Sequence, residues 1–213
     1  MEITWYGLSC FKLTERGMAT VVTDPYNAHE TGLSPLKVSA EIITVSHDAP
    51  EHNNLEAVKG TPYIVTGPGE YEVGGVFITG IQTGGHRGSA DSHNTLFVFD
   101  FDTITVAHLG ALNRLPTQAE VEAMGTVNIA LVPVGGGNSL NAARAAEVIN
   151  LLEPRIVIPM YYAIPNCNVA LEPLNKFLKE MGINEYQGQP SLKITQANLP
   201  EETQVIVLSD QRG

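Results

Sequence analysis

The residues Ile43–Asn54, with the sequence ITVSHDAPEHNN, join the end of an apolar strand to a loop that is rich in metal-binding residue types. The strand is expected over Glu41–Val45, and the loop carries His47, Glu51 and His52. Imidazole and carboxylate groups bind zinc, and a catalytic zinc ion needs about three of them plus an open position. A single histidine is more often a surface or hydrogen-bonded residue. The loop is therefore consistent with a mononuclear metal site, but its spacing alone does not establish one.

Two further histidines stand near the ends of other predicted strands. His86 lies in the Gly-rich turn TGGHRG after the strand Val76–Thr83, and His108 ends the strand Thr103–His108. Residues just past the ends of different strands can converge on one edge of a sheet, where sites are commonly built. We therefore expect His86 to join the loop ligands. His108 either lines the same cavity or is a packed, hydrogen-bonded core residue.

Short apolar runs bounded by Gly, Pro, Asn or Asp dominate the first half of the sequence and predict β-strands. The second half alternates strands with helical patterns, which indicates an α/β protein whose sheets are covered by helices. No linker or short-period repeat divides the chain, so residues 1–213 are predicted to form one domain. The predicted strands are Ile3–Tyr6, Cys10–Thr14, Ala19–Thr23, Glu41–Val45, Pro62–Thr66, Glu70–Val73, Val76–Thr83, Thr95–Phe101, Thr103–His108, Ile129–Val134, Arg155–Pro159, Ser191–Thr195 and Gln204–Leu208.

Three helices are predicted in the second half of the chain. Thr117–Met124 begins with a capping box, in which Thr117 is followed three residues later by Glu120. Asn141–Leu152 is rich in Ala and Leu and stops before Pro154. Leu171–Met181 is amphipathic and ends at Gly182.

The composition is that of an ordinary globular protein, with 43% apolar and 16% charged residues. Twelve Lys and Arg residues against 23 Asp and Glu residues give a net charge of −11. This charge disfavours a long anionic partner, so we expect a small-molecule substrate or ligand and no nucleic acid. Exposed sheet edges would allow a homo-oligomer.

The two cysteines, Cys10 and Cys167, are too few for a disulfide framework, and we expect buried or partly buried free thiols. No stretch approaches the roughly 18 consecutive apolar residues of a membrane span. The first residues also lack the basic and apolar regions of a signal peptide. We therefore expect a cytoplasmic protein with no membrane partner.

Nine segments carry a resemblance that runs through almost the whole chain: ITWYGLSCFKL (3–13), VVTDPY (21–26), ITVSHDAPEHNN (43–54), GPGEYEVGGVFITGI (67–81), TGGHRG (83–88), NTLFVFD (94–100), AHLGAL (107–112), LVPVGGG (131–137) and PRIVIPMYY (154–162). In this order and spacing they resemble the metallo-β-lactamase superfamily. Within it, they are similar to the predicted zinc-dependent hydrolases that include ascorbate-phosphate-lactonase-like proteins. The resemblance implies an αββα sandwich of two mixed β-sheets flanked by helices, with metal ions at one rim.

The metal-binding loop departs from the pattern of this family. The family loop reads His-x-His-x-Asp-His, and the first and last of these histidines fall on His47 and His52. The middle histidine is replaced by Ala49, and the aspartate is replaced by Glu51. Pro50 restricts the backbone of the loop, so its geometry is expected to differ from that of the family.

The remaining family ligands fall on three other segments. The next histidine falls on His86, the bridging aspartate on Ala111, and the last histidine on Tyr161. Three of the seven ligand positions therefore keep histidine, one has Glu in place of Asp, and three hold no standard ligand. Two ligands for each metal are fewer than the usual three or four. The resemblance thus implies one bound zinc ion at most.

Three interpretations of the function follow from these departures. In the first, a metal-dependent hydrolase holds zinc through His47, His52 and His86, and Glu51 is a fourth ligand or the general base. Tyr161 then donates to a developing oxyanion. In the alternative, the protein is a metal-free pseudoenzyme that serves as a small-molecule binding or interaction module. The third is metal-free acid–base catalysis by His47, Glu51 and Tyr161.

Two other motifs have a structural and a functional interpretation. Asp24, in VVTDPY, matches a family aspartate that orients a metal ligand through a hydrogen bond, but an Asp before Pro25 also initiates turns. The run Gly135–Gly137 resembles a phosphate-binding loop, but the Lys-Ser/Thr of that motif does not follow it. We expect a tight backbone passage at the sheet edge instead.

Overall fold

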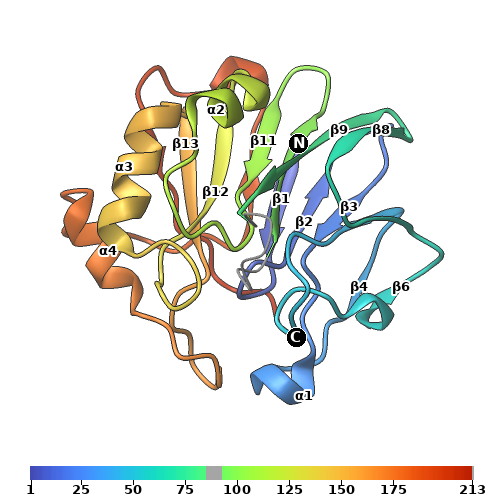
Figure 1. The fold of residues 1–213 in the computed structure, drawn as a ribbon, viewed down its shortest axis with the longest axis horizontal. Helices are drawn as coiled ribbons and strands as arrows, with labels where there is room; N and C mark the ends of the chain where they lie inside the picture. The colour runs from blue at the N-terminus through green and yellow to red at the C-terminus, as the bar shows by residue number, and fades with distance from the viewer. Residues whose placement is uncertain (85–92, 213) are drawn as a thin grey trace.

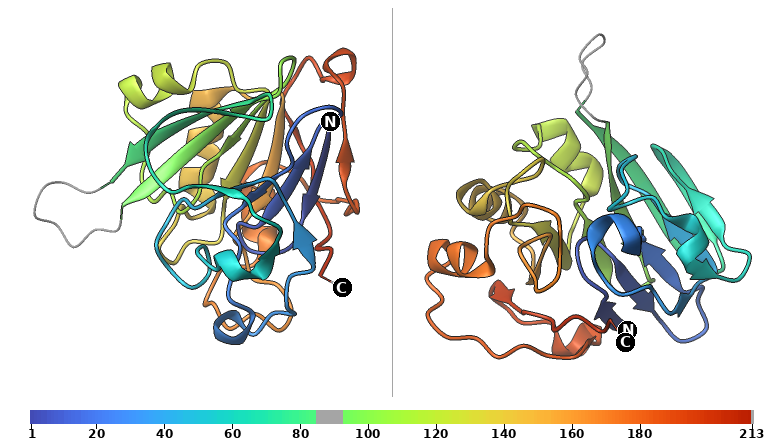
Figure 2. Two further views of the ribbon diagram at one scale, coloured as in Figure 1. Left: turned by 90° about the vertical axis from the view of Figure 1, so that its right-hand side faces the viewer. Right: turned by 90° about the horizontal axis from the view of Figure 1, so that it is seen from below.

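A computed structural model describes residues 1–84 and 93–212 of the protein. Two large mixed β-sheets and one small two-stranded sheet form the framework, and short helices lie around them (Figure 1). The turned views in Figure 2 show the two large sheets as separate layers of the molecule. This architecture confirms the predicted α/β class and the sandwich of two mixed sheets.

The six-stranded sheet has the order β14-β1-β2-β3-β5-β7. Its first strands pair antiparallel, whereas β3, β5 and β7 run parallel to one another. The strands are β1 Glu2–Trp5, β2 Phe11–Thr14, β3 Val21–Thr23, β5 Ile42–Thr44, β7 Tyr63–Val65 and β14 Leu192–Lys193.

The seven-stranded sheet has the order β15-β13-β12-β11-β10-β9-β8. The strands from β8 to β11 pair antiparallel, and β11, β12, β13 and β15 are parallel. The strands are β8 Gly69–Val73, β9 Val76–Thr83, β10 Asn94–Asp100, β11 Thr105–His108, β12 Ile129–Pro133, β13 Ile156–Met160 and β15 Gln204–Val205. The small parallel sheet joins β4 Val38–Ser39 to β6 Val58–Lys59.

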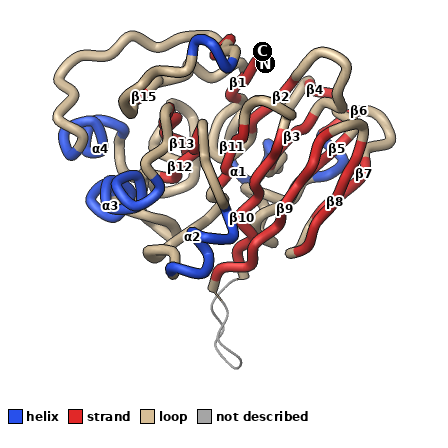
Figure 3. Tube along the Cα trace, turned by 90° about the horizontal axis from the view of Figure 1, so that it is seen from above, coloured by secondary structure: helices blue, strands red, loops and turns tan. Residues whose placement is uncertain are grey.

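The helices are α1 Ala28–Thr31, α2 Gln118–Met124, α3 Ala142–Leu152 and α4 Leu174–Glu180, with 3₁₀ turns η1 Leu55–Ala57 and η2 Gln196–Asn198. In Figures 1 and 3, α3 and α4 lie on the side of β12 and β13 that faces away from the six-stranded sheet. Every residue of β12 and β13 is buried, as expected for parallel strands that are covered on both faces.

Two of the predicted helices are found where the sequence placed them, and each has a side-chain cap. The Thr117 hydroxyl accepts from the backbone N–H of Glu120, and the Glu120 carboxylate accepts from the backbone N–H of Thr117, which completes the predicted capping box. Asn141 caps α3 by accepting from the backbone N–H of Arg144.

The third predicted helix begins later than expected, at Leu174 rather than Leu171. The backbone N–H of Glu172 donates to the carbonyl of Gly135, which draws this stretch out of the helix. Pro173 then stands at the N-cap, where its fixed φ and missing N–H suit a helix boundary. The predicted strands over Ser191–Thr195 and Gln204–Leu208 are also shorter in the structure, with two residues in each of β14 and β15.

Two further expectations concern the cysteines and the membrane. Both cysteines are free thiols, and Cys10 is buried whereas Cys167 is half-buried, as predicted. Among the described residues, none of the helices has the length and apolar character that a membrane crossing requires.

The ends of β12 and β13 pass close to one another at Gly135. A Cβ atom on Gly135 would collide with the carbonyl oxygen of Tyr161, which directly follows β13. Only a residue without a side chain fits there, so the predicted tight backbone passage is confirmed. This contact also fixes the backbone of Tyr161, one of the predicted site residues.

We predict that Gly135→Ala lowers the free energy of unfolding by about 1–3 kcal/mol, because the added methyl forces the two strand ends apart. The matched control is Gly67→Ala, since a Cβ at Gly67 meets no atom within 4 Å. Urea unfolding of both variants checks this expectation. Equal stabilities of the two variants would show that the strand ends can separate without cost.

Candidate functional site

The loop after β5 is held against both sheets. The backbone N–H of Thr95 in β10 donates to the Ser46 carbonyl over 2.8 Å. The backbone N–H of Asn27 donates to the Pro50 carbonyl over 2.8 Å, and that of Asn54 donates to the Pro25 carbonyl over 2.6 Å. The predicted ligands His47, Glu51 and His52 therefore stand on an anchored loop at the ends of the strands.

Asp24, directly after β3, is the hydrogen-bonding centre of the site. The side chain is fully buried, and its φ of 40° lies in the left-handed region. Its carboxylate accepts from the backbone N–H of Ser46 (2.7 Å), from the Ser46 hydroxyl (2.5 Å) and from His52 Nδ1 (2.8 Å). The orienting role that the resemblance implied for Asp24 is thus realised in the structure.

The charge of Asp24 is stabilised by its neighbours. Burial acts to raise the pKa of the carboxyl group, but the nearby His108 and His52 and the hydrogen bonds from His52 and Ser46 outweigh burial. The pKa of Asp24 therefore lies below its usual range, and the group is ionised at neutral pH.

His52 is positioned as a ligand with no partner on its outer nitrogen. Because Asp24 accepts a hydrogen bond from Nδ1, the proton of the neutral ring lies on Nδ1, and Nε2 carries a free lone pair. His52 is 0% exposed, and Nε2 has no hydrogen-bond partner among the described residues. An unpaired buried polar atom is costly, and the free lone pair of Nε2 is open to an electron-pair acceptor.

Tyr161 and Glu51 meet beside His52, although 110 positions separate them in the sequence. The Tyr161 hydroxyl donates to Glu51 Oε1 over 3.1 Å. The phenol ring stacks on the imidazole of His52, with ring centroids 5.3 Å apart and an interplanar angle of 30°. Burial, together with the charge and the hydrogen bond of Glu51, raises the pKa of Tyr161, so its hydroxyl stays protonated.

His47 lies on the more open side of the site. Its Nδ1 donates to the backbone carbonyl of His93 over 3.1 Å, and its ring meets that of His52 edge to face at 5.7 Å. A cavity of about 380 Å³ adjoins it, lined mainly by the polar residues Ser46, His47, Asp48, Asn53, His93 and Thr95. This cavity has the size of a small-molecule site.

Ala111 stands at the position where the family has its bridging aspartate. Its backbone N–H donates to Asn94 Oδ1 over 2.7 Å, and Asn94 Nδ2 donates to the Thr83 hydroxyl (2.9 Å) and to the Leu109 carbonyl (3.2 Å). The loop after β11 is thus fixed by Asn94. Sequence analysis used this residue only as a strand boundary and missed its role, because the signal is a single polar residue at the start of an apolar strand.

His108 is a core residue, as one of the two interpretations expected. It is fully buried, and its Nε2 donates to the Ser9 carbonyl over 2.9 Å, while Asp24 Oδ2 lies 3.9 Å away. Burial lowers the pKa of His108, although Asp24 and the Ser9 carbonyl act to raise it. His108 therefore lies beside the Asp24 carboxylate in the core, and its Nε2 is directed to the Ser9 carbonyl and not to the loop ligands.

The structure brings together four of the predicted site residues, His47, Glu51, His52 and Tyr161. The fifth, His86, lies outside the described residues. Within residues 1–84 and 93–212, no group of three or more His, Cys, Asp and Glu side chains is arranged to hold a metal ion. The described residues alone therefore do not fit a complete metal site.

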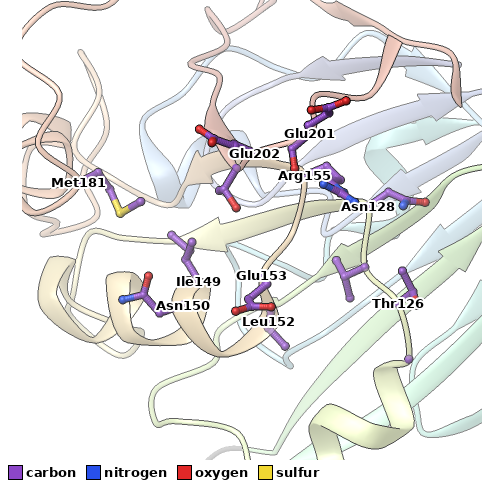
Figure 4. Close-up of a pocket in the computed structure, with 13 residues that line it drawn as sticks. Thr126, Asn128, Ile149, Asn150, Leu152, Glu153, Arg155, Met181, Glu201 and Glu202 are labelled. Carbon is purple, nitrogen blue, oxygen red and sulfur yellow. Dashed lines mark hydrogen bonds between the residues drawn. The ribbon is translucent and has the colours of Figure 1, made fainter. Parts of the chain in front are cut away.

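A second cavity lies elsewhere in the described part of the chain. It has a volume of about 900 Å³ and contains no predicted site residue. Figure 4 shows that it lies between the end of α3 and the segment that carries Glu201 and Glu202, with Arg155 and Asn128 beside it. Arg155 and Asn128 directly precede β13 and β12, whereas the candidate site lies beyond the far ends of these strands. The cavity is therefore separate from that site.

We predict that Asp24→Asn lowers the free energy of unfolding at pH 7 by about 3–5 kcal/mol, because it removes the charge that His52 and His108 surround. Asparagine tolerates the left-handed backbone, so the change reports on the charge and not on φ. Asp102→Asn is the matched control, since Asp102 is exposed and has a φ of 67°. Urea unfolding measures both, and a loss below about 1 kcal/mol in Asp24→Asn would contradict the central role of this carboxylate.

The same carboxylate gives a pH dependence. A folded-state pKa below the unfolded value stabilises the protein at pH values above the unfolded pKa of about 3.9. This contribution is lost as the pH falls through the lowered folded pKa. The stability difference between wild type and Asp24→Asn is therefore expected to be full at pH 6 and to shrink below about pH 4. A difference that stays constant down to pH 3 would show that Asp24 does not titrate in this way.

The matches between this chain and known proteins agree on one family. A family model described as "Beta-lactamase superfamily domain" matches residues 2–161. A UPF0173 protein of Pyrococcus abyssi is 26% identical over 186 residues, which cover 76% of this chain and 83% of that protein. A UPF0173 metal-dependent hydrolase of Thermoplasma acidophilum is 25% identical over 189 residues, with the same coverage of 76% and 83%.

A solved structure extends the match to the whole fold. A candidate Zn-dependent hydrolase of the metallo-beta-lactamase superfamily from Thermotoga maritima is 36% identical, with a TM-score of 0.80 and coverage of 97% of both chains. The two large sheets, the loop after β5 and the matches along the chain lead to one conclusion. This chain belongs to the metallo-β-lactamase superfamily and has its fold.

Proposed function

We propose that this protein keeps the fold of a metal-dependent hydrolase but lacks a two-metal centre and binds one metal ion at most. The observation that carries the proposal is which side chains occupy the positions where the family has its metal ligands. Glu51 and Tyr161 are hydrogen-bonded to one another, and the Tyr161 ring lies on His52. At Ala49 and Ala111 the side chain is a methyl group, which coordinates nothing. A clamp of two metal ions needs more ligands than these positions supply.

A single zinc ion depends on residues that the structure only partly describes. His47 and His52 are neighbours, and His52 Nε2 has no partner within residues 1–84 and 93–212. Two imidazoles are fewer than the three protein ligands of a usual catalytic zinc site. The proposal therefore assigns the third place to His86, which lies outside the described residues, with Glu51 as a fourth ligand only if it leaves Tyr161.

The catalytic roles of Glu51 and Tyr161 are part of the same proposal. Glu51 as general base and Tyr161 as oxyanion donor would both require that their mutual hydrogen bond opens, because it occupies the Tyr161 proton and one Glu51 oxygen. The cavity beside His47 would hold a small-molecule substrate. The net charge of −11 favours such a partner over nucleic acid.

One observation favours a second candidate function, a metal-free binding or interaction module. The side chains of Glu51, Tyr161 and His47 each have a hydrogen-bond partner within the protein. A site whose polar groups already satisfy one another gains less from a metal ion than an open site does. In this case the fold would present the cavity beside His47 to a ligand without hydrolysing it.

We expect protein purified without chelator to contain no more than one equivalent of any transition metal, measured by elemental analysis. If the single-metal proposal holds, zinc at 100 times its Kd stabilises the fold by about 2.7 kcal/mol and raises Tm by about 5–10 °C. No metal and no shift would support the metal-free module. Two equivalents in the wild type would overturn the proposal.

We also predict that the triple variant Ala49→His, Ala111→Asp, Tyr161→His binds two equivalents of zinc, because it returns a ligand to each changed position. The control is Ala143→His, which adds an imidazole to an exposed position on α3. Hydrolysis of generic lactone and phosphodiester substrates, with and without EDTA, is the second measurement. Chelator-sensitive turnover by the wild type would rule out the metal-free module.

A further inference from the structure

The backbone around Tyr161 holds its side chain in one direction. Tyr161 has a φ of 53°, a left-handed conformation that is unusual for an aromatic residue. Its N–H donates to the Leu8 carbonyl over 3.1 Å, and its own carbonyl lies against Gly135. Two other segments of the chain thus fix this conformation, and the phenol projects into the site as a consequence of the fold.

The phenol contacts the two groups that would otherwise be free to bind a metal ion on this side. Its hydroxyl binds Glu51 Oε1, and its ring covers the imidazole of His52. Tyr161 is only 2% exposed, so the ring fills this space and does not lie at its entrance. The hydroxyl is engaged as a donor to Glu51, so neither group is left open toward a metal ion.

The phenol of Tyr161 occupies the space beside His52 without giving His52 Nε2 a hydrogen bond. Asp24 orients the ring and leaves Nε2 with a lone pair, yet the Tyr161 hydroxyl is bonded to Glu51. Among the residues that the structure describes, Nε2 stays unpaired in a buried place, which is unfavourable. The orientation of His52 thus suits an electron-pair acceptor, such as a metal ion, better than it suits the phenol ring of Tyr161.

We propose that Tyr161 is an internal plug, whose phenol excludes a metal ion from the pair formed by Glu51 and His52. This inference rests on the proposed function and deepens it, since it says which part of the site is closed and by which residue. It predicts that the pair becomes a metal site when position 161 supplies a ligand. Glu51, His52 and an imidazole would then form a set of two histidines and one glutamate, which is a known ligand set of catalytic zinc.

The decisive variant is Tyr161→His, and histidine is among the residues that tolerate a left-handed backbone. We expect it to bind Zn²⁺ with an apparent Kd at least about tenfold below any wild-type value. The readout is the affinity and not an additional equivalent, because the proposed single zinc ion also uses His52. Isothermal titration with ZnCl₂ gives the affinity, and elemental analysis after dialysis gives the stoichiometry. Tyr186→His is the matched control, because Tyr186 is exposed and lines a cavity that includes neither Glu51 nor His52.

Two further variants keep the test decisive. Tyr161→Asp places a carboxylate at the same position, is also tolerated in the left-handed region and is expected to show the same tighter binding. Adding His52→Gln to Tyr161→His is expected to abolish the gain in affinity. Circular dichroism without zinc shows which variants are folded. The inference is overturned if the folded variants bind zinc no more tightly than the wild type, or if the gain in affinity survives in the double variant.

These results separate the two proposals. The stoichiometry of the wild type alone tests whether the protein binds one metal ion at most. The difference between the wild type and Tyr161→His tests the plug. A wild type with two equivalents and an unchanged variant would overturn both proposals, whereas a wild type with none or one and an unchanged variant would overturn the plug alone.

Discussion

The buried carboxylate of Asp24 is the constraint on which the rest of the site depends. A buried charge is unfavourable unless hydrogen bonds and opposite charges surround it, and Asp24 meets this condition through Ser46, His52 and the nearby His108. Its left-handed backbone is tolerated because these partners together hold the residue in that conformation. The contacts of Asp24 fix the start and the end of the loop after β5, and thereby the orientation of His52 towards Tyr161.

Features that depend on neighbours in sequence could be predicted from the sequence. The capping box of Thr117 and Glu120 sets the start of α2, and the buried strands β12 and β13 follow from their uninterrupted apolar runs. The later start of α4 could not be predicted, because it depends on a hydrogen bond from Glu172 to Gly135, which are far apart along the chain. Tertiary contacts decided that boundary against the local helical pattern.

The candidate site shows the same division. The loop residues His47, Glu51 and His52 stood out through their residue types and their place after a strand, and the family resemblance added Tyr161. Their arrangement was not predictable, because the bond between Tyr161 and Glu51 spans 110 positions and depends on the backbone angle of Tyr161. Asn94 was missed for a related reason, since a polar residue at a strand boundary carries no sign of the loop that it holds.

The Glu51–Tyr161 contact joins the two layers of the molecule. Glu51 stands on the loop that extends from the six-stranded sheet, and Tyr161 follows β13 of the seven-stranded sheet. Hydrogen bonds weaken steeply with distance and misalignment, so a slide of one layer against the other by about an ångström would open this one. The ultraviolet absorbance of a phenol responds to the loss of such a bond. The chain has seven tyrosines, so the difference spectrum against a Tyr161→Phe variant isolates this response and reports how the two layers are placed, without an added label.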